Sequence, residues 1–189
     1  SSDLPIPGPP NAPHDPVNLT VVAEEALRSV EPSITRNEGL GTVVVTTRFE
    51  PLPPILGDST ALRAALINVV SNAIDAMPAG GTLEVSTRHV NSDVEVLVRD
   101  TGIGMNDEVR RRCFEPFFTT KGARGTGIGL ASTRATVEGH GGSISVDTTQ
   151  GIGTTIALRL PVPGLSATDG TAAPGSGTRV RATATDVAR

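Results

Sequence analysis

Two pairs of short segments, in which apolar and polar residues alternate, constrain the fold of this chain more than any other feature. The first pair is formed by residues 83–87 and 94–98, with a turn-rich stretch between them. The second pair is formed by residues 144–146 and 156–160. Strict alternation is typical of half-buried strands, and a short polar turn makes two such strands antiparallel neighbours. The sequence therefore predicts two β-hairpins.

Helical patterns precede the first hairpin. Apolar residues at helical spacing predict a helix that begins after the capping residue Asn18 and that Pro32 must break or kink. A β-branched strand at 42–49 follows, and three prolines then forbid regular structure until the next capping residue, Asp58. A second helix runs from there to about residue 77 with one continuous apolar face. Hairpins interspersed with helices predict an α+β two-layer sandwich, with helices on one face of a mixed, mostly antiparallel sheet.

The folded part of the 189-residue chain is predicted to span residues 17–161. Residues 1–16 contain six of the 15 prolines and almost no apolar side chains, so we expect an extended linker there. Residues 162–189 are rich in Ala, Thr, Gly, Ser and Pro without hydrophobic periodicity, and we expect a disordered tail.

The composition excludes two large classes of protein. No apolar run approaches the roughly 18 residues that a membrane-spanning helix needs. The net charge of -4 and the 2% of aromatic residues argue against nucleic-acid binding, which normally uses a basic face with aromatic platforms. The single cysteine, Cys113, cannot form an internal disulfide and fits a reducing compartment. We therefore expect a cytoplasmic domain without direct membrane contact, whether or not a longer parent protein is anchored in a membrane.

Polar residues form a stripe on the second predicted helix. Asn68, Asn72 and Asp75 are spaced so that they share one side of it, away from the apolar face. A solvated helix face is the simplest interpretation of such a stripe. An asparagine amide oxygen is also a hard, neutral ligand that suits a Mg²⁺ ion whose remaining oxygens come from water and nucleotide phosphates.

An acidic residue followed by two glycines ends one of the predicted strands, as Asp100-Thr-Gly-Ile-Gly. A carboxylate at a strand end can accept a hydrogen bond from an exocyclic amine, and Gly102 and Gly104 would let a flat ring approach the backbone. A turn that leads into a short helix at about 106–112 explains the same residues equally well.

Two further motifs follow. Three of the four phenylalanines lie within residues 114–118, shortly before Lys121, which is the only lysine beside 15 arginines. Such a cluster is either a segment that docks by its rings or a small satellite core. Four glycines between 122 and 129 then precede a helix that reaches about residue 137. Exposed amides and the helix dipole make such a helix start suitable for phosphate oxygens, whereas the spacing fits neither a P-loop nor a dinucleotide fold.

The order and spacing of these motifs resemble the catalytic, ATP-binding domain of bacterial sensor histidine kinases over about residues 17–161. The motifs are Asn-Val-Val-Ser-Asn-Ala-Ile-Asp-Ala at 68–76, Asp-Thr-Gly-Ile-Gly at 100–104, Phe-Glu-Pro-Phe-Phe-Thr-Thr-Lys at 114–121, Gly-Thr-Gly-Ile-Gly-Leu-Ala at 125–131, Glu-Gly-His-Gly-Gly-Ser-Ile-Ser-Val at 138–146 and Gly-Ile-Gly-Thr-Thr at 151–155. The resemblance implies the Bergerat ATP-binding fold, with a five-stranded sheet and ATP under a lid. Residues 72–81 look most like kinases of the nitrogen-regulation type.

The resemblance also implies roles for individual residues. It assigns Mg²⁺ to Asn72, the phosphates to Lys121 with Asn68 nearby, the adenine amine to Asp100, and support of the adenine end to Thr155. Asn68, Asn72 and Lys121 would then be the catalytic residues. The other residues that it places around the nucleotide are Asp75, Gly102, Gly104, Met105, Phe118, Gly125, Thr126, Gly127, Gly129 and Leu130.

The amide at position 68 bears on the reaction. Related ATPases that resemble this chain place a glutamate there to activate water, and an asparagine cannot act as a general base. Transfer of the γ-phosphoryl group to a histidine is therefore favoured over hydrolysis. None of the chain's histidines looks like the acceptor, because His14 lies between prolines, His89 ends a strand and His140 precedes one in a structural position.

We therefore expect the acceptor histidine on a separate dimerisation and phosphoacceptor domain, upstream or on another protein, which docks on the phenylalanine side. An aspartate of a response regulator would be the final recipient. Two alternatives stay open. One is an ATPase of the same superfamily (GHKL) that hydrolyses ATP with a base from elsewhere, and the other is a non-catalytic, nucleotide-dependent interaction module.

Overall fold

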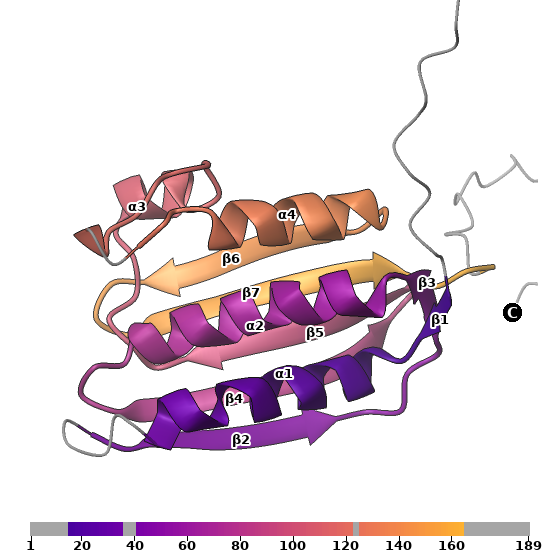
Figure 1. Cartoon of the computed structure of the whole chain (residues 1–189), viewed down its shortest axis with the longest axis horizontal. Helices are drawn as coiled ribbons and strands as arrows, with labels where there is room; N and C mark the ends of the chain where they lie inside the picture. Colours follow the sequence, from indigo (N-terminus) through magenta and orange to yellow (C-terminus); the bar gives the residue numbers. More distant parts are fainter. Residues whose placement is uncertain (1–14, 36–40, 123–124, 165–189) are drawn as a thin grey trace, which may run out of the picture.

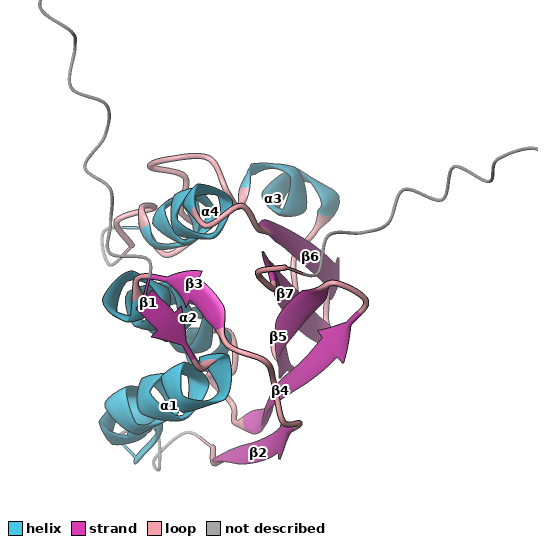
Figure 2. Cartoon of the chain, turned by 90° about the vertical axis from the view of Figure 1, so that its right-hand side faces the viewer, coloured by secondary structure: helices cyan, strands magenta, loops and turns pink. Residues whose placement is uncertain are grey.

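A five-stranded sheet forms one layer of the molecule, and helices cover one of its faces (Figures 1 and 2). This computed structural model describes residues 15–35, 41–122 and 125–164. In spatial order the strands are β2 (Val43–Phe49), β4 (Gly81–Val90), β5 (Asp93–Asp100), β7 (Gly153–Pro161) and β6 (Ser143–Thr149). β2 and β4 are parallel, and the other neighbouring pairs are antiparallel. The predicted mixed, mostly antiparallel sheet is therefore confirmed.

The two predicted hairpins are β4–β5 and β6–β7. In the first, Val85 lies opposite Val98 and both are buried, because the alternating residues turn one face toward the helices. The turn between β4 and β5 is only Asn91 and Ser92. Asn91 has a φ of 57°, a left-handed conformation that asparagine tolerates better than most residues.

The helical layer consists of α1 (Leu19–Thr35), α2 (Ser59–Asp75) and α4 (Gly129–Gly139), with the short α3 (Asp107–Arg112) at one end (Figure 2). The main core lies between this layer and the sheet, and α2 is its central helix, contributing Leu62, Ala65, Leu66, Val69, Val70, Ala73 and Ile74. Both predicted caps are present. Asn18 accepts from Thr20 N (3.0 Å), and Asp58 accepts from two amides of the first turn of α2. No helix in the described ranges is long and apolar enough to cross a membrane.

Pro32 does not break the first helix, which continues to Thr35. A proline removes one backbone donor and crowds the carbonyl four residues earlier. In the last turn of a helix these losses affect few hydrogen bonds, so the preceding turns hold the helix together.

A two-stranded ribbon was not predicted. β1 (Asp15–Val17) pairs antiparallel with β3 (Ile55–Gly57). The sequence interpretation placed Asp15 and Pro16 in a linker and denied regular structure before Asp58, and the ribbon corrects both points. Proline is compatible with such a pair because it lies at an edge, where its missing N–H costs no ladder bond.

The other domain boundary also moves slightly. Val162 is buried, and its N–H donates to Ser92 O at 3.0 Å, so this residue packs with the domain although it was assigned to the tail. Residues 1–14 and 165–189, to which the rest of the linker and tail predictions apply, lie outside the described residues.

Candidate functional site

The C-terminal half of α2 carries the predicted polar stripe, and the structure brings Lys121 to it. The ammonium of Lys121 donates to Asn72 Oδ1 at 2.6 Å and pairs with Asp75 Oδ2 at 2.7 Å. Two oxygens from successive turns of the helix therefore converge on one cation. Both are hard donors of the kind that Mg²⁺ prefers. The donor set thus fits the predicted metal position at Asn72, with Asp75 beside it.

Asn68 connects α2 to the start of α4. Its Nδ2 donates to Gly129 O at 3.3 Å, and Gly129 is the first residue of α4. Ile128, at the N-cap position, makes no side-chain capping bond, so the first-turn amides are not satisfied by the usual cap. Together with the helix dipole, this leaves α4 with a start that favours an anion. Asn68 is therefore a neighbour of Gly129, one of the residues whose amides are predicted to meet the phosphates.

Asp100 ends β5 in a buried position, with 6% of the residue exposed. Its Oδ1 accepts from Gly102 N (2.8 Å) and from Thr154 N (3.2 Å). Burial raises the pKa of the carboxyl, and the two amide hydrogen bonds only partly oppose this effect. Among the described residues none donates to Oδ2, which leaves that oxygen available as an acceptor for an amine.

Thr155 was assigned to the adenine end, and the structure corrects this. In the sheet register Asp100 lies opposite Thr154, whereas Thr155 lies opposite Arg99. Successive side chains of a strand point to opposite faces, so Thr155 lies on the face away from Asp100 and the helices. Thr154, which the motif assignment missed, takes the expected place. The buried alternation of 154, 156, 158 and 160 is the signal that could have identified it.

Thr154 also belongs to a polar network around this end of the site. Its hydroxyl lies 2.9 Å from that of Thr148 on β6, and Thr148 Oγ1 accepts from Met105 N at 2.9 Å. The half-buried Met105 is thereby fixed beside the Asp100 loop.

The two glycines after Asp100 make room for the protein's own backbone. A Cβ on Gly102 would lie 2.3 Å from Ala76 O, just beyond α2, and one on Gly104 would lie 2.1 Å from Thr149 O. Gly104 also has a φ of 61°. The predicted reason for these glycines, approach of a flat ring, is therefore not needed to explain them. Gly102 thus seats the Asp100 loop against the end of α2, and Gly104 seats it against the end of β6.

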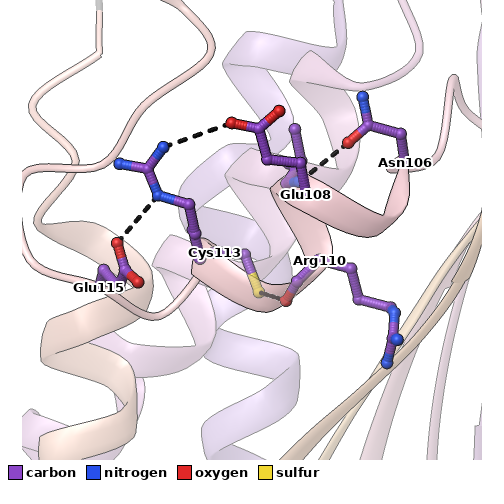
Figure 3. Close-up of polar contacts among 7 residues, drawn as sticks. Asn106, Glu108, Arg110, Cys113 and Glu115 are labelled. Carbon is purple, nitrogen blue, oxygen red and sulfur yellow. Dashed lines mark hydrogen bonds and ion pairs between the residues drawn. The ribbon is translucent and has the colours of Figure 1, made fainter.

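The phenylalanine segment is organised by α3 (Figure 3). Arg112 contacts both Glu108 (3.5 Å) and Glu115 (3.0 Å), and its guanidinium lies 4.3 Å from the centre of the Phe118 ring. Burial raises the pKa of the Cys113 thiol, which donates to Arg110 O. Phe118 is half-buried, and its ring lies under the Arg112 guanidinium.

Phe117 differs from its neighbours because 77% of it is exposed. Its φ of 68° is unusual for a bulky residue, and its N–H donates to Gly127 O at 2.9 Å. A Cβ on Gly127 would lie 2.4 Å from the Phe117 carbonyl carbon, so only glycine fits there. The phenylalanine and second glycine motifs are therefore tied together by their backbones.

The remaining predicted residues lie along the same segment. Gly125 is half-buried beside Thr119, Thr126 is exposed, and Leu130 lies half-buried in the first turn of α4. The structural role expected of His140 is confirmed. Its Nε2 accepts from Asp58 N (2.9 Å), and its Nδ1 donates to Thr136 O (2.7 Å).

Comparisons with known proteins agree with this geometry. Residues 57–164 match the family described as histidine kinase-, DNA gyrase B-, and HSP90-like ATPase. Sporulation kinase E of Bacillus subtilis is 40% identical over 115 residues, which are 60% of this chain and 15% of that protein. The signal transduction histidine-protein kinase AtoS of Escherichia coli is 33% identical over 147 residues, or 77% of this chain and 24% of that protein. The chain thus spans under a third of the length of the curated relatives that it matches.

Solved structures of similar shape include histidine kinases. The mycobacterial sensor histidine kinase MprB aligns with a TM-score of 0.69 and 31% identity, covering 78% of this chain and 97% of that one. The catalytic domain of histidine kinase ThkA aligns with a TM-score of 0.68 and 27% identity, covering 78% and 95%. Full-length ShkA in complex with AMPPNP aligns with a TM-score of 0.70 and 26% identity, covering 80% and 31%.

Proposed function

Because the chain belongs to the histidine kinase-, DNA gyrase B- and HSP90-like ATPase family, and its fold is that of histidine kinase catalytic domains, we propose that it binds Mg·ATP and transfers the γ-phosphoryl group to a histidine on a separate domain. The curated relatives named above are kinases, one of them a signal transduction histidine-protein kinase, and ShkA was solved with AMPPNP, an ATP analogue. Both facts support an ATP-binding catalytic domain of a two-component system.

The asparagine at position 68 is the reason for proposing transfer of the γ-phosphoryl group rather than hydrolysis of ATP. It lies where α2 meets the start of α4, and its amide nitrogen donates to Gly129 O. An amide cannot take a proton from water, so this position supplies no general base. A histidine imidazole is already a good nucleophile and needs mainly positioning and charge stabilisation.

Different residues of the site would bind different parts of the nucleotide. Asp100 Oδ2 would accept from the adenine amine. The first-turn amides of α4 and the ammonium of Lys121 would meet the phosphates. Asn72 Oδ1 would be a protein ligand of Mg²⁺, which neutralises charge on the phosphate oxygens when it is bound. In this structure the Lys121 ammonium donates to Asn72 and Asp75. ATP binding would therefore have to move the ammonium from these oxygens to the phosphates.

We also propose where the partners act. Phe117 is the exposed ring beside the phosphate end, so the phosphoacceptor domain would dock on this side and place its histidine near the γ-phosphate. An aspartate of a response regulator would receive the group next. A supply of ATP and a reduced Cys113 both fit a cytoplasmic location.

Calorimetric titration of Mg·ATP, with phosphate release followed in parallel, tests the proposal. We expect saturable binding without sustained release, and Asn72→Ala should abolish the dependence of binding on Mg²⁺. Sustained release by the chain alone would instead support an ATPase. Phosphoacceptor domains supplied in trans, each with its acceptor histidine intact or replaced by Gln, then test transfer. If ATP binds and no acceptor is ever labelled, the non-catalytic interaction module is correct.

A further inference from the structure

Thr133 is a buried polar residue of α4 for which the proposed mechanism has no role. It is 0% exposed. Its Oγ1 donates to Gly129 O at 2.9 Å, within α4, and also lies 3.3 Å from Ala65 O on α2. One hydroxyl is therefore shared between the carbonyls of two helices.

α2 and α4 are neighbours in the helical layer (Figure 1), and the Thr133 contact lies between two others that join them. At one end His140 accepts from Asp58 N, and at the other Asn68 donates to Gly129 O. The N-terminal end of α2 therefore meets the C-terminal end of α4, and the helices are antiparallel.

Threonines inside helices often donate to the carbonyl four residues earlier, and such a bond alone has only local meaning. Two observations go beyond it here. The acceptor, Gly129 O, is also the acceptor of Asn68 Nδ2, and the hydroxyl reaches the α2 carbonyl of Ala65 as well. Ala65 and Asn68 lie one turn apart on α2, as Gly129 and Thr133 do on α4. The four residues form a continuous chain of polar contacts between the helices.

We propose that Thr133 is a positioning residue for the phosphate end of the nucleotide site. Its hydroxyl fixes the first turn of α4 against α2 and, through Gly129 O, orients the amide of Asn68. Because Nδ2 is committed to Gly129 O, Asn68 Oδ1 points away from this bond. This inference rests on the proposed function, because it assumes that α4 begins at the phosphates.

The test compares two ligands and matched threonine variants. Mg·ATP reaches both ends of the site, whereas adenosine reaches only the Asp100 end. Thr133→Val keeps the shape and removes the hydroxyl, and it should weaken Mg·ATP binding about two- to tenfold while leaving adenosine affinity unchanged, because one hydrogen bond contributes that much. Thr133→Ser should bind both ligands like the wild type. Thr87→Val is the control. Thr87 lies on β4, is 1% exposed and donates to Glu50 O, so the same change at this buried threonine should alter neither affinity.

A second pair of variants guards against misfolding. Thr133→Ser and Thr133→Ala differ only in the hydroxyl, so if the valine variant fails to fold, this pair should show the same selective loss of Mg·ATP affinity. Equal weakening of both ligands would mean a purely structural role and would overturn the inference, as would unchanged Mg·ATP affinity without the hydroxyl. If the wild type bound neither ligand, the proposed function would fall together with the inference. If the wild type bound both, only the inference would be at stake.

Discussion

Replacing Asp100 by asparagine should change which nucleotide the domain prefers, ATP or inosine triphosphate, without reducing the stability of the fold. Asp100 Oδ1 accepts from Gly102 N and Thr154 N, and an asparagine Oδ1 can accept the same two bonds. The substitution therefore changes only the second atom of the group, from an acceptor oxygen to a donor NH₂. In the proposed site this atom faces the amine of adenine.

The cost for ATP can be worked from these contacts. Binding loses a hydrogen bond to a charged acceptor, about 1.5–3 kcal/mol, and leaves two donors facing each other at a further 1–3 kcal/mol or so. The two terms add to about 2.5–6 kcal/mol, and the middle of this range, about 4 kcal/mol, weakens ATP binding several hundredfold. Inosine triphosphate carries an oxygen where adenine carries the amine, so the variant's new NH₂ can donate to it.

The assay is a calorimetric titration of wild type and Asp100→Asn with ATP and with inosine triphosphate, both as Mg²⁺ complexes. The wild type should prefer ATP, and the variant should prefer inosine triphosphate. A variant that keeps the wild-type preference for ATP would refute the assignment of Asp100 to the adenine amine. The two ligands share ribose and phosphates, so a change at the phosphate end would move both affinities together.

The same variant should not lose stability at neutral pH. Burial raises the pKa of Asp100 in the folded state, so folding favours the protonated form. The wild type therefore loses stability as the pH rises from the ordinary value of 3.8 through the raised pKa, and asparagine removes this loss. The melting temperature of the variant at pH 7.5 should equal or exceed that of the wild type. A large decrease would show that the carboxylate makes a stabilising contact that the geometry does not reveal.

Two further predictions concern charged groups. Lys121→Met should weaken Mg·ATP binding about ten- to a hundredfold and leave adenosine binding unchanged, because the proposed contact of the Lys121 ammonium with the phosphates is a hydrogen bond between charged groups; an equal effect on adenosine in calorimetry would contradict this. Glu95 is 1% exposed and pairs with Arg88 and Arg159, and although burial raises its pKa, the two arginines lower it overall. Glu95→Gln should therefore reduce the unfolding free energy in urea by about 1–3 kcal/mol at pH 7 without changing ATP affinity. Since a lowered pKa contributes stability above 4.5 that is lost in acid, the difference should shrink as the pH falls below that value, and a constant difference would exclude this cause.

The parts of the fold that the sequence predicted are those with a repeating local signal. The hairpins follow from alternation, and α2 begins where Asp58 accepts from Thr60 N and Ala61 N, as its side chain and position suggested. β1 and β3 carry no such signal, because three residues are too few to show a period. Their pairing depends on chain segments about 40 residues apart, which local patterns do not encode.

The candidate site divides in the same way. Asn68 and Asn72 could be placed on one side of a helix from spacing alone, but the contact of Lys121 with Asn72 joins residues 49 positions apart and depends on how the phenylalanine segment folds back. Thr133 carried no signal, since a threonine inside a helix is usually unremarkable.

The misplacement of Thr155 has a more specific physical origin. Two threonines in succession match a motif equally well, so position in the motif cannot choose between them. The period of the strand can choose between them. Its side chains alternate, and the apolar residues at 156, 158 and 160 show that the even-numbered positions face the helices. Thr154 is one of these even-numbered positions, and it lies opposite Asp100 in the sheet register. Where a motif and the period of a strand disagree, the period is the better guide, because a shift of one residue moves every side chain of the strand to the wrong face.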